Sequence, residues 1–134
     1  MTTLFQGEGI SNFEFLTNRS GDFRPLVKEV LSQARYSSTG NYNGEPCFLT
    51  AYQIAVLLNK TDRTLKGTLP IGGEGVGPDS FARQIAWHLS QDFNNKVFDN
   101  KLEIQFLSTD GLDSFTFDGG HKPSLSEFSM FRLL

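Results

Sequence analysis

The side chains with nucleophilic or acid–base chemistry are few in this chain. It has one cysteine, Cys47, and two histidines, His88 and His121. A thiol beside an imidazole base is a recurring catalytic pair, but no spacing in the sequence brings these three together. Cys47 follows a proline and precedes a phenylalanine, a setting typical of a small buried residue.

The acidic side chains give no better candidate for catalysis or metal binding. Asp110, Asp113, Asp118 and His121 are close in sequence and carry metal-binding groups. Asp110, however, belongs to a predicted turn, and Asp113 and Asp118 lie at opposite ends of a predicted strand. No two carboxylates are spaced for general acid–base work. We therefore predict no catalytic residue, no metal ligand and no cofactor, and we expect that the protein is not an enzyme.

A glycine-rich segment precedes a predicted helix. Its glycines are Gly72, Gly73, Gly75 and Gly77. Backbone N–H groups at such a junction bind phosphate when the sequence is G-x-x-x-x-G-K-[ST], but here Pro78 and Asp79 replace the lysine and the hydroxyl residue. The favoured interpretation is a connector. The alternative is a loop that closes over a small nucleotide or phosphate, with positive charge from Arg24 and Lys28.

Three helices are predicted from apolar spacing and capping residues. The first spans 24–35, with Pro25 in its first turn. The second spans 50–58, where Thr50 and Gln53 form a capping-box pattern. The third spans 80–93 and is capped by Asp79 or Ser80. Its predicted buried stripe consists of Phe81, Ala82, Ile85, Ala86, Leu89 and Phe93.

The last third of the chain alternates between apolar and polar residues, as strands do. The dipeptide Asp110-Gly111 is a strong hairpin signal. A two-residue turn there pairs Phe106 with Phe115 and Ile104 with Phe117, and all four lie on one side of the ribbon. We therefore predict a β-hairpin over 102–118, with a third strand over 127–133. The expected fold class is α+β, with three helices packed on a small antiparallel C-terminal sheet.

This order of elements resembles that of the winged-helix proteins. Within 48–65, Ala55, Asn59 and Leu65 also have the spacing of a helix-turn-helix. In the winged-helix family the third helix enters the DNA major groove and the hairpin is the wing. The resemblance implies a partner-binding face on helix 80–93, formed by Arg83, Gln84, Trp87, His88 and Gln91. The wing carries Glu103, Asp110, Asp113 and Asp118, which would repel phosphate.

Length and charge narrow the class of protein. With 134 residues, 38% hydrophobic and 20% charged, the sequence predicts one compact domain over 1–134, with residues 1–11 loosely ordered. A net charge of −3 argues against a general nucleic-acid binder. The lone cysteine, and the lack of a predicted membrane span or signal peptide, indicate a cytoplasmic protein. We expect a small regulatory or binding protein with a protein partner, or less favourably a nucleic-acid partner such as DNA.

Overall fold

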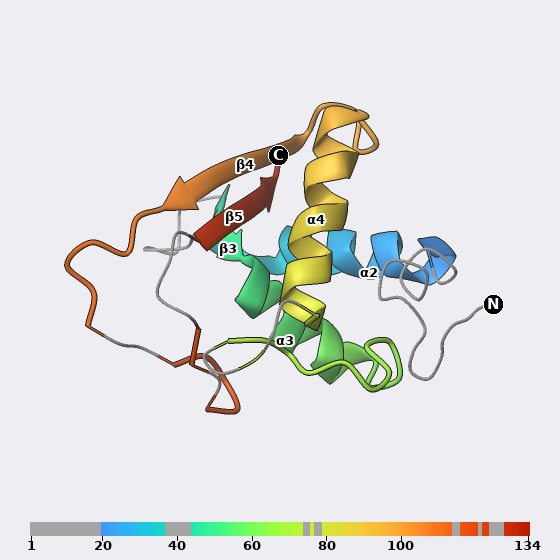
Figure 1. Cartoon of the computed structure of the whole chain (residues 1–134). Coiled ribbons are helices and arrows are strands. Elements are labelled where there is room, and N and C mark those ends of the chain that lie inside the picture. Colours follow the sequence, from blue (N-terminus) through green and yellow to red (C-terminus); the bar gives the residue numbers. More distant parts are fainter. Residues whose placement is uncertain are drawn as a thin grey trace.

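The protein has an α+β fold in which the three helices of the described residues pack on a small antiparallel sheet (Figure 1). The computed structural model describes residues 20–36, 44–73, 76, 79–113, 116–120, 122–123 and 128–134. Its helices are α2 (Ser20–Gln33), α3 (Ala51–Thr61) and α4 (Phe81–Asn94). The fold class predicted from sequence is confirmed. The predictions for residues 1–11 lie outside the described residues.

The central strand of the sheet is the last strand in the chain. Strand β5 (Phe128–Leu133) lies between β3 (Leu49–Thr50) and β4 (Leu102–Leu107), and both pairings are antiparallel. A separate pair joins β1 (Arg35–Tyr36) to β2 (Glu45–Pro46). The predicted third strand is thus confirmed as β5. Because β5 contacts strands from both halves of the sequence, it joins the helical part of the chain to its C-terminal part.

The predicted 102–118 hairpin is wrong in its partner strand. Ile104 pairs with Phe131 and not with Phe117, and Phe106 pairs with Ser129, so the partner of β4 is β5. Phe115, the predicted partner of Phe106, lies outside the described residues. A turn does form at the expected place, where the Leu112 N–H donates to the Thr109 carbonyl at 3.0 Å. Of its two central residues only Gly111 has a positive φ, 82°. The favoured two-residue hairpin turn needs a positive φ at both, so this turn only bends the connection from β4 to β5.

The first helix begins earlier than predicted. Helix α2 starts at Ser20, so Pro25 lies inside it and removes one backbone hydrogen bond. Val27, Val30 and Leu31 are buried, and α2 contacts both α3 and β5. Apolar packing on one face therefore offsets the loss at the proline.

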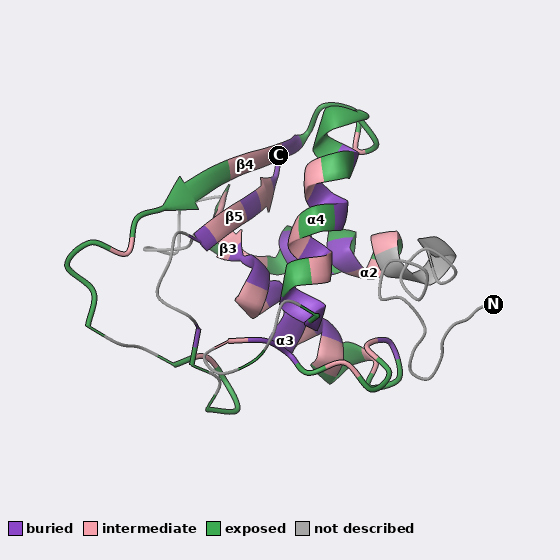
Figure 2. Ribbon diagram, in the orientation of Figure 1, coloured by how far each residue is buried: buried purple, intermediate pink, exposed green. Residues whose placement is uncertain are grey.

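The start of α3 confirms the capping-box prediction. The Gln53 N–H donates to Thr50 Oγ1 at 3.2 Å, and the Thr50 N–H donates to Gln53 Oε1 at 2.8 Å. Helix α3 continues beyond Leu58 to Thr61. Figure 2 colours parts of α3 as buried, and α3 contacts α2, α4, β3 and β5, consistent with a helix at the centre of the core. None of the described helices is long and apolar enough to cross a membrane.

Helix α4 buries a different set of residues from the one predicted. Ser80 caps it, accepting a hydrogen bond from the Arg83 N–H, and Phe81, Ala82, Ile85 and Leu89 are buried. Phe93, however, is 46% exposed, whereas His88 and Asp92 are buried. An i, i+4 series rotates by about 40° per step on a 3.6-residue helix. After three steps from Phe81 the series has left the buried sector, which Asp92 occupies instead.

Candidate partner-binding face on α4

The exposed side of α4 brings together four of the five residues predicted to bind a partner. Arg83, Trp87 and Gln91 recur every four residues and are exposed, and Gln84 lies half-buried beside them. Trp87 has 46% of its surface exposed, which is high for so large an apolar side chain. The face therefore has an aromatic centre with hydrogen-bonding side chains one helical turn away on either side.

His88 does not belong to this face, which corrects the prediction. It is buried on the inner side of α4, and the rings of His88 and Trp87 form an edge-to-face contact with centroids 5.2 Å apart. Burial lowers the pKa of His88 below its ordinary value; the Asp92 carboxylate raises this pKa and the Arg24 guanidinium lowers it. A neutral imidazole at pH 7 follows, and its role is to pack against the inner edge of Trp87 instead of contacting a partner.

An ion pair that sequence reasoning missed anchors the C-terminal half of α4. Arg24 on α2 donates from Nε to Asp92 Oδ2 at 3.0 Å and from Nη2 to Asp92 Oδ1 at 2.7 Å. Asp92 is only 2% exposed, and its carboxylate raises the pKa of Arg24. This two-pronged geometry is the strongest arrangement for such a pair. Arg24 is therefore engaged with α4 and does not face an open ligand site.

The first three amides of α4 are already bonded within the protein. The N–H groups of Phe81 and Ala82 donate to the carbonyls of Pro70 and Ile71 at 2.8 and 2.9 Å. The Arg83 N–H donates to the Ser80 hydroxyl at 3.2 Å. These amides are among the four that a helix start leaves without a helical partner. The residues just before Gly72 therefore satisfy two of the donors that a phosphate would need.

Gly72 and Gly73 serve packing in this arrangement. A Cβ atom on Gly73 would lie 2.1 Å from the Lys122 carbonyl oxygen, and one on Gly72 would lie 3.0 Å from Ser80 Oγ. Both glycines have a positive φ, 128° for Gly72 and 117° for Gly73. Gly73 therefore allows close approach of the Lys122 backbone, and Gly72 close approach of the Ser80 side chain, where the ligand hypothesis would place a phosphate. Gly75 and Gly77 lie outside the described residues.

The remaining parts of the alternative ligand site are far apart. Arg24 meets α4 at Asp92, twelve residues beyond Ser80, or about 18 Å along the helix. Lys28 is exposed and lines a separate cavity of about 210 Å³ with Arg35 and Lys101. The described residues thus do not assemble the predicted nucleotide or phosphate site.

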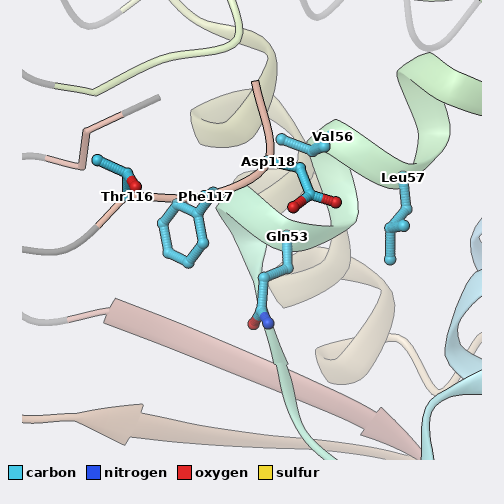
Figure 3. A pocket seen from close by; sticks show the side chains of 6 residues that line it. All are labelled: Gln53, Val56, Leu57, Thr116, Phe117 and Asp118. Atoms are coloured by element: carbon cyan, nitrogen blue, oxygen red, sulfur yellow. The ribbon is translucent and has the colours of Figure 1, made fainter. Parts of the chain in front are cut away.

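A hollow of about 270 Å³ lies between α3 and the 116–118 segment (Figure 3). Its polar lining is already engaged, because Gln53 caps α3 and Asp118 accepts from Lys60 Nζ at 2.7 Å. That contact lowers the pKa of Asp118. Phe117 stacks on Tyr52, with ring centroids 5.6 Å apart. The hollow is therefore a seam between packed elements and offers no group arranged for chemistry.

In comparisons with protein-family models, with curated proteins and with solved structures, nothing matches this chain. Within the described ranges, no group of three or more His, Cys, Asp or Glu side chains is placed to hold a metal ion. The exposed face of α4 is therefore the candidate site with the most specific geometry.

Proposed function

We propose that this protein is a non-catalytic binding protein that recognises a protein partner through the exposed face of α4. The observation that carries the proposal is the exposure of Trp87 between Arg83 and Gln91 on a rigid, capped helix. Tryptophan and arginine are the residues most enriched among those that dominate binding energy at protein interfaces. A helix held at both ends presents them without the entropy cost of ordering a loop.

Charge favours a protein over a nucleic acid as the partner. Nucleic-acid affinity comes largely from several Lys and Arg side chains that neutralise phosphates. On the exposed face of α4 only Arg83 is charged; its neighbours are Gln84, Trp87, Gln91 and Asn94. The chain as a whole carries a net charge of −3. One cation with neutral hydrogen-bonding side chains suits a mixed polar and aromatic protein surface.

The resemblance to winged-helix proteins supports the choice of this helix. Helices α2, α3 and α4 are followed by an antiparallel β4–β5 hairpin, the position of the wing in that family. The wing would then include the described residues that follow β4, among which Asp110, Asp113 and Asp118 are exposed acids. Acidic residues on the wing would repel DNA, so the resemblance here points to the helix face and not to duplex binding.

The experiment uses a photo-crosslinking amino acid in place of Gln91 to trap and identify the partner. The purified partner is then titrated against the wild-type protein and the variants Trp87→Ala, Arg83→Ala and Gln33→Ala. Trp87→Ala is expected to weaken binding about 30-fold, equivalent to about 2 kcal/mol. Gln33 is exposed on α2, so Gln33→Ala is the control that leaves affinity unchanged.

Two results would overturn this proposal. One is equal affinity for wild type and Trp87→Ala. The other is tight binding to short duplex DNA that falls steeply with added salt, which would make phosphate neutralisation the basis of recognition.

A further inference from the structure

Strand β4 (Leu102–Leu107) forms an outer edge of the sheet. Its six residues pair with β5 along one side, and no described strand pairs with its other side. Figure 1 shows β4 at the margin of the fold, beyond β5. The N–H and C=O groups along that outer side form a template onto which another strand can add.

The edge lacks most of the features that usually prevent strand addition, and its one charged residue is paired within the protein. Soluble proteins protect long edges with lysine, proline, a bulge or an inward-pointing charge. The sequence Leu-Glu-Ile-Gln-Phe-Leu contains no lysine or proline, and it pairs with β5 residue for residue without a bulge. Phe106 is 66% exposed, the highest value among the exposed large hydrophobic residues of the described chain. Such an edge is typical of a surface that is covered in the functional state.

The charge of the edge is also neutralised within the protein. Glu103, its one charged residue, accepts from Arg132 Nε at 2.5 Å. Arg132 in turn donates to the Pro46 carbonyl at 3.3 Å and lies over the Phe48 ring at 4.6 Å. Since the strand is otherwise uncharged, two copies can approach without like-charge repulsion.

We propose that the outer edge of β4 pairs antiparallel with β4 of a second copy of this chain, forming a two-fold symmetric dimer. In an antiparallel ladder, two paired residues either both direct their backbone N–H and C=O groups toward the shared edge or both direct them away from it. In two identical strands the numbers of two paired residues must therefore differ by an even number, so the symmetry axis passes through a residue. An axis through Glu103 would place two carboxylates opposite each other.

An axis through Gln105 gives the best side-chain pairs. Gln105 then faces its own copy, and Ile104 faces Phe106 of the second chain on each side of the axis. Aromatic and β-branched residues stabilise each other across strands, and this pairing covers the exposed Phe106 ring. An axis through Ile104 would instead place Phe106 opposite Leu102, which is already buried in the core.

This pairing uses the long edge of both copies, so it stops at a dimer and does not extend into an array. The opposite edge of the sheet is β3, which has only two residues, so a repeating edge-to-edge array has no template of matching length. A six-residue edge with one aromatic contact on each side is a small interface. We therefore expect a dimer with a dissociation constant on the order of 10 µM.

The test is site-specific disulfide formation, in a Cys47→Ser background that removes the native thiol. Directly paired residues have Cα atoms about 4.5–5.5 Å apart, within the range a disulfide spans. Gln105→Cys is therefore expected to cross-link into a dimer under mild oxidation. Ser108→Cys is the matched control, since its two copies would be about 20 Å apart along the ladder.

A second measurement is the molar mass in solution at about 100 µM, ten times the expected dissociation constant. The wild type is expected near twice the chain mass of 15.0 kDa, and Phe106→Lys is expected near the chain mass itself. Leu112→Lys removes another exposed apolar side chain, outside β4, and should leave the dimer intact. A monomeric wild type would overturn the proposal. So would a dimer that survives Phe106→Lys, or equal cross-linking at 105 and 108.

Discussion

The ion pair between Arg24 and Asp92 should behave asymmetrically when either partner is removed. Asp92 is 2% exposed, whereas the Arg24 side chain is 34% exposed. Arg24→Met therefore leaves a buried carboxylate without its counter-charge. Asp92→Asn leaves a guanidinium that water can still reach, facing an amide oxygen that can accept one of its hydrogen bonds. The first substitution is expected to cost more than the second.

Magnitudes follow from this difference in burial. Breaking a buried ion pair costs about 3–5 kcal/mol, and the partial exposure of Arg24 places Arg24→Met near the lower limit, about 3 kcal/mol. Asp92→Asn loses charge assistance on hydrogen bonds that remain partly satisfied, so its cost is about 1 kcal/mol. At about 4 °C per kcal/mol for a chain of this length, the melting temperature falls by about 12 °C and about 4 °C, respectively.

The pH dependence of Arg24→Met gives a further check. Arg24 lowers the pKa of His88 and Asp92 raises it, so removing Arg24 raises the folded-state pKa of His88 above its wild-type value. The folded variant then takes up a proton more readily, and its deficit relative to wild type shrinks as pH falls below about 6.5. Urea unfolding at pH 7.5 and 5.5 measures both effects. The reasoning is refuted if Asp92→Asn costs as much as Arg24→Met, or if the deficit of Arg24→Met grows at low pH.

Three further predictions concern single positions. Because burial lowers the pKa of His88, the unfolded wild-type chain binds a proton more readily than the folded one. The midpoint of urea unfolding should therefore fall as pH drops below about 6.5. His88→Gln should make the midpoint less dependent on pH in this range. Gly73→Ala should lower the free energy of unfolding by at least about 2 kcal/mol, because the added Cβ meets the Lys122 carbonyl. Gly111 has a φ of 82° and open space around it, so Gly111→Ala should lower it by about 1 kcal/mol. Equal losses would contradict the packing role of Gly73. Lys96 has a φ of 57° just past the end of α4, a conformation that glycine adopts without strain. Lys96→Gly should therefore raise the free energy of unfolding by about 0.5–1 kcal/mol. A lower melting temperature would show that the contacts of the Lys96 side chain matter more than its backbone conformation.

Local signals in the sequence predicted the structure well where short-range contacts decide it. The pattern of Thr50 and Gln53 predicted the capping box with its reciprocal hydrogen bonds, and Ser80 was one of two predicted caps for α4. Apolar spacing predicted the helix that became α2, although it placed the helix start at Arg24, with Pro25 in the first turn, instead of at Ser20. Propensity at a proline was outweighed there by packing of the whole helix face.

Long-range contacts account for the predictions that failed. The alternation of Ile104 and Phe106 fits two partners equally well, 115–117 and 128–133, and only the three-dimensional sheet decides between them. The ion pair joins residues 68 positions apart, so no local pattern reveals it. For the candidate site, spacing predicted a shared face for Arg83, Trp87 and Gln91. It failed for His88 because a four-residue rule ignores the rotation of the helix.

The late position of the central strand has a consequence for how the chain folds. Helices α2, α3 and α4 come before β5 in the chain, and α3 contacts both α2 and α4, so a helical cluster can form early. The sheet cannot, because β3 and β4 both depend on β5, whose contacts with β3 span about eighty residues. Closing such a loop is slow compared with helix formation. During synthesis, β4 therefore emerges from the ribosome before its partner strand, and a chain truncated after 107 would leave both β3 and β4 without the strand that pairs with them.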